Sequence, residues 1–172
     1  MNRRQFTKLL AGVGLLLAGC RAGAAPSSST PERKDSMQTT TQTYTRTTPI
    51  ETVRNDPVFG DYGRLIFPVE RSYYSGDTLE QLHLTYYNNI DPDETVDICN
   101  TLRQRAADGQ TIFYDIYTED EQAADPDKAD TGLFYFKGNP GAKFSICNAG
   151  GAFAYVGAMQ DSFPHALELS PK

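Results

Sequence analysis

The clearest hydrophobic pattern in the chain lies between residues 91 and 109. Asp91–Glu94 carries a helix-start signal, with Asp91 at the N-cap, a proline at the first helical position and Glu94 closing a capping box. Gly109 is typical of the residue that follows a helix. Between these signals, apolar side chains recur every three or four residues and so share one helical face. The sequence therefore predicts a helix whose buried face is formed by Val96, Cys99, Leu102 and Ala106.

Short apolar runs bounded by Gly, Pro and acidic residues predict extended segments elsewhere. Thr111–Tyr117 has apolar side chains on both faces, as in a sheet that is covered on both sides. Thr118–Ala124 is predicted to be an acidic short helix or turn, and Phe144–Cys147 a buried strand. Arg64–Val69 is predicted to be a short strand or an extended segment, and Leu133–Lys137 a strand. A short helix that begins at Asp77 or Thr78 is predicted to bear Leu79, Leu82 and Tyr86.

The first twenty residues have the pattern of an export signal. The apolar run Leu9–Gly19 would span about 17 Å as a helix, short of a bilayer core of about 30 Å, so residues 1–19 indicate a signal peptide and not a transmembrane span. Arg3 and Arg4 resemble the twin-arginine export motif, although a positively charged start also serves the general secretory route. Leu17–Cys20 resembles a lipobox, which implies that Cys20 is acylated and anchors the mature protein to the membrane. A plain secretory signal with an incidental cysteine is the alternative.

Composition divides the remainder of the chain into a linker and a domain. Residues 20–55 are rich in Ser, Thr, Pro and Gln, with almost no apolar side chains, and are predicted to be a disordered spacer before a folded domain at 56–172. The net charge of -6 argues against a nucleic-acid partner, which requires a basic surface. Cys99 and Cys147 are predicted to be buried small hydrophobic residues, and a disulfide between them stays open.

The stretch Lys143–Phe153 joins the predicted buried strand to a glycine turn, and the rest of the domain is organised around it. Gly150 and Gly151 allow backbone angles that a Cβ atom would forbid. Two successive backbone N–H groups that point outward at such a turn form a site for an anion. In an acyl-transfer enzyme such a site is an oxyanion hole, whereas in many proteins a Gly-Gly pair is only a tight turn.

Ala149–Phe153 resembles the HGGGF-type oxyanion loop of α/β-hydrolase esterases and lipases. The flanking stretches Gly132–Gly138 and Asp161–Leu169 resemble exported bacterial members of that family. The chain departs from the motif at Ala149, where the family has His, and at Ala152, where it has Gly. If the turn requires a positive φ at Ala152, the alanine strains it by about 1–2 kcal/mol. The resemblance implies an α/β fold, comprising the first strands, the oxyanion loop and the start of helix A of an α/β hydrolase.

The resemblance also implies activity on carboxylic esters or acylated carbohydrates, with Gly150 and Gly151 as oxyanion donors and no cofactor. The family's nucleophile lies in a Gly-x-Ser-x-Gly elbow, which does not occur in this sequence. We therefore expect the N-terminal portion of an exported, lipid-anchored hydrolase on the outer face of the cytoplasmic membrane or on the cell surface. This portion should be inactive alone, because the nucleophile, acid and His are absent. Without neighbouring strands, Phe144–Cys147 would also have unpaired edges.

Three further groups of residues invite a catalytic or metal-binding interpretation. His83 has no metal-spaced partner and is predicted to be a surface or half-buried residue. Ser162 and His165 share one helical face, but Asp161 and Ser162 are better explained as helix capping. The acidic residues between the predicted strands lack EF-hand spacing, because Ala129 occupies a ligand position. A solvated loop without a metal ion is expected for Asp125, Asp127 and Asp130.

A second interpretation involves no chemistry: a surface lipoprotein whose domain binds a protein partner or a glycan. Ten tyrosines and nine phenylalanines suit aromatic stacking on a ligand and the core of a sheet equally well. Composition therefore does not choose between the hydrolase class and the binding-module class.

Overall fold

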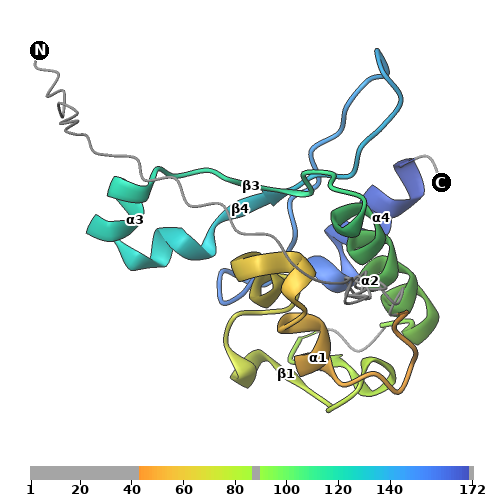
Figure 1. Cartoon of the computed structure of the whole chain (residues 1–172). Helices are drawn as coiled ribbons and strands as arrows, with labels where there is room; N and C mark the ends of the chain where they lie inside the picture. The colour runs from red at the N-terminus through yellow and green to blue at the C-terminus, as the bar shows by residue number, and fades with distance from the viewer. Residues whose placement is uncertain (1–42, 87–89, 171–172) are drawn as a thin grey trace, which may run out of the picture. The chain divides into compact units, whose positions relative to one another are not determined.

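The computed structural model describes residues 43–86 and 90–170, which belong to one compact unit (Figure 1). Two pairs of antiparallel strands accompany short helices and turns. Within these two ranges, no helix is long and apolar enough to cross a membrane. The elements are α1 (Ile50–Arg54), η1 (Pro57–Leu65), η2 (Arg71–Tyr73), β1 (Tyr74–Ser75), η3 (Leu79–Gln81), β2 (His83–Leu84), α2 (Pro92–Ala107), β3 (Phe113–Asp115), α3 (Glu119–Ala124), η4 (Pro126–Asp130), β4 (Gly132–Phe134), η5 (Ala158–Gln160) and α4 (Ser162–Leu169).

The helix predicted after residue 91 is confirmed as α2. The Asp91 carboxylate accepts hydrogen bonds from the backbone N–H groups of Asp93 at 2.8 Å and Glu94 at 3.0 Å. The helix ends at Ala107, and Gly109 follows with a φ of 76°, as expected of a stop signal. Val96 and Ala106 of the predicted face are only half-buried, whereas the buried side chains of α2 are Thr95, Ile98, Cys99 and Leu102.

The hydrophobic core is formed by the first part of the described chain together with the segment that carries η5 and α4. Helix α2 contacts η1, η3 and α4, so it joins both contributions. Burial of apolar surface contributes about 25 cal/mol per Å² to folding, which makes this cluster the main source of stability. Its buried side chains are Tyr44, Ile50, Val53, Phe59, Ile66, Phe67, Tyr74, Leu79, Leu82, Leu84, Ile98, Cys99, Leu102, Ile112, Ala158, Met159 and Phe163.

The folded unit begins earlier than the predicted boundary at residue 56. Tyr44 is buried, and its backbone N–H and C=O form hydrogen bonds with the side-chain amide of Asn100, at 2.8 and 3.0 Å. Ile50 and Val53 of α1 are buried as well. The linker predicted for residues 20–55 is therefore wrong for residues 44–55, because a few spaced apolar side chains anchor this polar stretch to the core. Residues 20–42 lie outside the described residues.

The strand predicted over Arg64–Val69 does not form. Asp56 instead begins the 3-10 helix η1, since its carboxylate accepts a hydrogen bond from the Val58 N–H at 3.0 Å and a proline occupies the first turn. Ile66 and Phe67 follow this helix and are buried in the core without strand pairing. The apolar run is therefore buried, but the predicted strand is absent.

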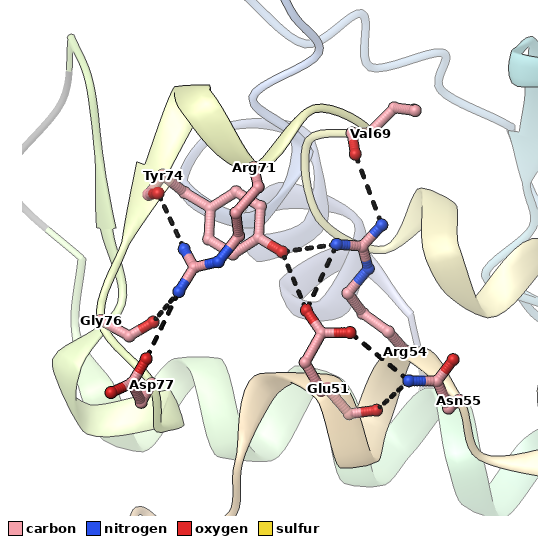
Figure 2. A network of polar contacts seen from close by, with 8 residues as sticks. All are labelled: Glu51, Arg54, Asn55, Val69, Arg71, Tyr74, Gly76 and Asp77. Atoms are coloured by element: carbon pink, nitrogen blue, oxygen red, sulfur yellow. Dashed lines mark hydrogen bonds and ion pairs between the residues drawn. The ribbon is translucent and has the colours of Figure 1, made fainter.

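A polar network joins α1 to the turn that contains η2 and β1 (Figure 2). The guanidinium carbon of Arg71 lies 4.2 Å from the Tyr74 ring centroid, and Arg71 donates to the backbone oxygens of Tyr74 at 2.8 Å and Gly76 at 2.7 Å. Arg54 of α1 donates to the Tyr74 hydroxyl at 2.6 Å. These contacts stabilise a region with little regular structure, in which η3 takes the place of the helix predicted after Thr78.

Strands β3 and β4 form an antiparallel hairpin in which Phe113 pairs with Phe134 and Tyr114 with Leu133. The Phe113 and Phe134 rings both contact the Tyr62 ring of η1. Tyr114 and Leu133 are exposed on the other face of the hairpin. The prediction of a sheet covered on both faces is therefore wrong, because the described residues leave this outer face open.

The acidic segment after β3 is confirmed as a short helix, α3. Thr118 and Glu121 form a reciprocal capping box: the Glu121 N–H donates to the Thr118 hydroxyl at 3.3 Å, and the Thr118 N–H donates to the Glu121 carboxylate at 2.9 Å. Figure 1 shows α3 and the following turn η4 at the end of the β3–β4 hairpin. The cap explains how a helix of this length and charge can form.

The buried strand predicted over Phe144–Cys147 is absent from the structure. Residues 135–149 form no helix or strand, and Phe144 and Ile146 are 88% and 68% exposed. Figure 1 shows a loop here that extends away from the helices. A strand requires partners for its backbone N–H and C=O groups, and none of the described residues pairs with this segment. The α/β-hydrolase fold class therefore stays a prediction.

Candidate functional site

The glycine turn forms a closed loop between residues 150 and 157. The Gly150 carbonyl oxygen accepts a hydrogen bond from the Gly157 N–H at 2.9 Å, which closes the loop. Inside it, the Gly151 carbonyl oxygen accepts from the N–H groups of Ala154 at 2.9 Å and Tyr155 at 3.3 Å. The position of the Gly150 and Gly151 amides is thus fixed by the turn's own backbone.

Only glycine fits at position 151. Its φ is 147°, and a Cβ atom there would lie 1.7 Å from the Tyr155 carbonyl oxygen, far inside any allowed contact. The next two residues, Ala152 and Phe153, have φ values of 54° and 60°, in the left-handed region that L-residues seldom adopt. The positive φ anticipated at Ala152 is therefore present, and the turn bears the strain that follows from it.

The turn holds an anionic oxygen. The Gly150 N–H donates a hydrogen bond to the Asp161 carboxylate at 2.7 Å. The neighbouring Gly151 N–H has no hydrogen-bond acceptor among the described residues. Hydrogen bonds to an ionised carboxylate are shorter and stronger than bonds between neutral groups. The two amides predicted to be oxyanion donors therefore include one that binds a charged oxygen in this structure.

The same contact corrects the interpretation of Asp161 as a helix cap. Asp161 stands at the N-cap position of α4 but makes no capping hydrogen bond, because its carboxylate lies against the glycine turn. Ser162 is buried and His165 is exposed, and no hydrogen bond joins their side chains. The structure therefore does not assemble a Ser162–His165 dyad.

Tyr155 of the turn is the centre of a row of three tyrosine rings. The Tyr155 ring stacks between those of Tyr73, at a centroid distance of 5.1 Å, and Tyr86, at 5.9 Å. Within the described part of the chain, the buried Tyr155 hydroxyl has no hydrogen-bond partner, and neither do the buried side-chain amide atoms of Gln160. Sequence inspection missed Asp161 and Tyr155, because their partners lie on other elements and no local motif connects them.

The two cysteines of the described chain are free thiols. Cys99 is a buried residue of α2, as predicted, and burial raises the pKa of its thiol to about 12, so it is protonated at neutral pH. Cys147 is only half-buried, so its prediction as a buried hydrophobic residue is wrong: the strand that would have covered it does not form. The two thiols are not joined in a disulfide.

The remaining predicted residues are distributed as follows. His83 is exposed, as predicted. Within residues 43–86 and 90–170, no group of three or more His, Cys, Asp or Glu side chains is arranged to hold a metal ion, and Asp130 of the acidic loop pairs with Arg64. The predicted signal and anchor residues Arg3, Arg4 and Cys20 lie outside the described residues.

Comparisons with protein families, with characterised proteins and with solved structures find no match for this chain.

Proposed function

We propose that this chain is the front portion of an exported, lipid-anchored hydrolase of carboxylic esters, in which Gly150 and Gly151 donate hydrogen bonds to the oxyanion. The observation that carries the proposal is the 2.7 Å hydrogen bond from the Gly150 N–H to the Asp161 carboxylate. An acyl-transfer oxyanion carries the same charge on the same kind of atom, so an amide that holds a carboxylate oxygen has the required chemistry.

The backbone of the turn supports the assignment. Gly151 adopts an angle that only glycine accepts, and the strained Ala152 and Phe153 continue the same tight curve. Residues in such angles are kept where the surrounding structure over-determines them, and they are common at binding and catalytic sites. The strain is consistent with a turn whose shape serves a purpose beyond reversing the chain.

The exposed segment before the turn also fits the proposal. In the hydrolase family the strand preceding the oxyanion loop lies inside a sheet, and here the corresponding Phe144 and Ile146 are exposed with unpaired backbone. Such a segment is what remains of an internal strand when its neighbours are not supplied. In the complete enzyme, those neighbours would pair with it and bury its side chains.

Two events must then occur before catalysis. The Asp161 carboxylate must leave the Gly150 N–H, since one N–H cannot hold both that carboxylate and the oxyanion. A nucleophile with its base must also be supplied, because the described part of this chain does not assemble one. Each oxyanion donor contributes about 2.7–4 kcal/mol to transition-state stabilisation, so the loss of one should be easy to measure.

The test is to express the full coding region to which this chain belongs and to measure kcat/KM for p-nitrophenyl acetate. Gly150→Pro removes the N–H that holds the Asp161 carboxylate, at a position without a positive φ, and should lower kcat/KM by about 10²- to 10³-fold. Gly138→Pro, in the exposed segment, is the matched control and should retain most activity. Equal activity of both variants would contradict the proposal. The chain by itself should neither turn over the ester nor be labelled by a fluorophosphonate.

A second candidate function is a non-catalytic module that binds a glycan. It is favoured by the Tyr73–Tyr155–Tyr86 row, because sugar rings stack on aromatic faces and Tyr86 is 59% exposed. Affinity electrophoresis in gels containing xylan would test it. Tyr86→Ala should abolish any retardation, whereas Tyr135→Ala, an exposed tyrosine outside the row, should not. Equal migration of the wild type with and without xylan would count against this candidate for that polysaccharide.

A further inference from the structure

A hollow of about 260 Å³ lies between η1, β3 and the α3–η4 segment, on elements different from those that form the glycine turn. Figure 1 shows these elements around the β3–β4 hairpin. The polar and aromatic side chains that line the hollow come from three separate elements, η1, β3 and α3. They are Asp61, Tyr62, Arg64, Phe113, Asp115 and Gln122.

The hollow has an excess of negative charge. Arg64 does not balance it, because its guanidinium is paired with the Asp130 carboxylate and donates to the Ala129 carbonyl oxygen at 3.0 Å. Asp61 has no hydrogen-bond or ion-pair partner among the described residues. Asp115 accepts a single hydrogen bond, at 3.3 Å, from the Gln122 side-chain amide. Two carboxylates are therefore left for a positively charged group.

The walls of the hollow also have an apolar part. The Tyr62 and Phe113 rings stack at a centroid distance of 5.1 Å with an angle of 13° between their planes. Leu65 lines the same space. An alkyl chain can pack against such surfaces, and aromatic rings also attract cations that approach their faces.

From this combination we propose that the hollow binds a small organic cation, namely an ammonium or guanidinium group on a short apolar stem. The stem packs against Tyr62, Phe113 and Leu65, and the charged head pairs with Asp61 and Asp115. The helix α3 that borders the hollow begins with Glu119, Asp120 and Glu121, so its field attracts cations towards the site. The inference does not depend on the proposed hydrolase function.

The experiment is an NMR titration of the chain with n-butylamine, with n-butanol as the uncharged ligand of the same stem. Butylammonium should shift the amide signals of Asp61 and Asp115 and the side-chain amide of Gln122, and butanol should shift them much less. Equal shifts by butanol would overturn the proposal, because the site would then recognise only the stem. Shifts spread evenly over α3 and η4 would also overturn it, since they would indicate a diffuse ion atmosphere.

Variants of the lining carboxylates test whether they bind the charged head of butylammonium. Asp61→Asn with Asp115→Asn should weaken butylammonium binding by about 2- to 30-fold, the range expected when two exposed ion pairs are lost. Asp127→Asn removes an exposed carboxylate that does not line the hollow, and should leave the affinity unchanged. Equal weakening by both changes would contradict the assignment. Because the wild-type shifts are read without any variant, a folding defect in the double variant would not hide the answer.

The same cationic chemistry can be supplied by a free amine or by a basic side chain of a peptide. Titrations with agmatine and with acetyl-Gly-Arg-Gly-amide separate these sources. Stronger binding of agmatine assigns the site to free amines, and stronger binding of the peptide assigns it to protein partners. Failure of both to shift the Gln122 side-chain amide would overturn the proposal.

Discussion

Two regions of this chain are both rich in apolar residues, but only one of them buries its hydrophobic side chains in the core. Residues 44–112, together with the segment from Ala158 to Phe163, supply every buried hydrophobic side chain of the described core. Residues 113–157 supply none, although Phe134, Phe136, Ala149 and Tyr155 are partly buried against it. Eight large hydrophobic side chains in this second region are exposed: Tyr114, Ile116, Leu133, Tyr135, Phe144, Ile146, Phe153 and Val156.

The difference shows that apolar content alone does not bury a segment. The first region folds on itself, because α2 presents a continuous apolar face to neighbours within the same stretch of chain. The second region contains strand-like sequence on either side of α3 and η4, and a strand buries its side chains only as part of a sheet. The exposed Phe144 and Ile146 are what a strand without its neighbours would leave, which supports the proposal of a larger hydrolase.

The largest effect should come from a buried ion pair within the first region. Asp56 lies within 2.9 Å of Arg103 and 2.5 Å of the Tyr44 hydroxyl, and both charged side chains are nearly inaccessible. Asp56→Ala leaves Arg103 buried without its partner and should lower the free energy of unfolding by about 3–5 kcal/mol, measured by urea titration. The matched change Asp93→Ala breaks the exposed pair with Arg46 and should barely move the urea midpoint. Similar losses in both variants would show that the Asp56 cluster is not a buried anchor.

A core isoleucine and an exposed one provide the next comparison. Ile98 in α2 is fully buried, and Ile98→Ala should cost about 2–5 kcal/mol of unfolding free energy, because it leaves a cavity. Ile146→Ala makes the same change in the exposed segment and should alter stability by less than about 0.5 kcal/mol. A large cost at Ile146 would mean that residues 135–149 are packed in solution and would contradict the contrast.

Acid should destabilise the first region through Asp56. Burial by itself would raise the pKa of Asp56, but the hydrogen bonds from Tyr44, the Val58 N–H and Arg103 outweigh it and lower the pKa below the ordinary 3.8. A lowered pKa contributes stability above the unfolded-state value, and that contribution is lost as the pH falls below about 3.8 and approaches the folded-state value. Thermal melts of the wild type should therefore lose stability in this range more steeply than those of Asp56→Ala. If the melting temperatures of the wild type and Asp56→Ala fell in parallel with pH, this role of Asp56 would be contradicted.

The smallest effect is expected in the glycine turn. Ala152→Gly removes the steric cost of a left-handed alanine, about 1–2 kcal/mol, and is partly offset by the greater freedom of glycine in the unfolded chain. A net gain of about 0.5–1 kcal/mol is expected in urea unfolding. Ala154→Gly, in the same loop but without a positive φ, should give no gain. A loss at Ala152 would show that its strain is absent in solution.

Much of the secondary structure could be predicted from signals within a few residues of each element. The Asp91 cap, the Gly109 stop and the acidic helix after Thr118 were predictable, because their hydrogen bonds join residues a few positions apart. The Arg64–Val69 strand failed because the 3-10 helix η1, which resumes after a break at Gly60, runs as far as Leu65. The apolar Ile66 and Phe67 are buried without a sheet. The predicted Phe144–Cys147 strand failed because pairing depends on segments distant in sequence.

In the candidate site, too, the features that depend on neighbouring residues were predictable and those that depend on distant residues were not. The positive φ at Ala152 could be anticipated from the glycine motif, since it depends on local geometry. The Asp161 carboxylate on Gly150 could not, because a helix-capping role was the better local explanation for that residue. The hollow lined by Asp61 and Asp115 could not be predicted from the sequence either, because its lining residues lie on four elements and no motif connects them.

The most direct test of a hydrolase built around Gly150 and Gly151 is the DNA sequence beyond the codon for Lys172, translated in all three forward frames. We expect one frame to encode strands, a Gly-x-Ser-x-Gly elbow, and then an acidic residue and a histidine. That result would give the exposed Phe144–Cys147 segment its partners and the glycine turn its nucleophile. An unrelated gene in that position would contradict the hydrolase proposal and would leave the glycan-binding module as the better interpretation.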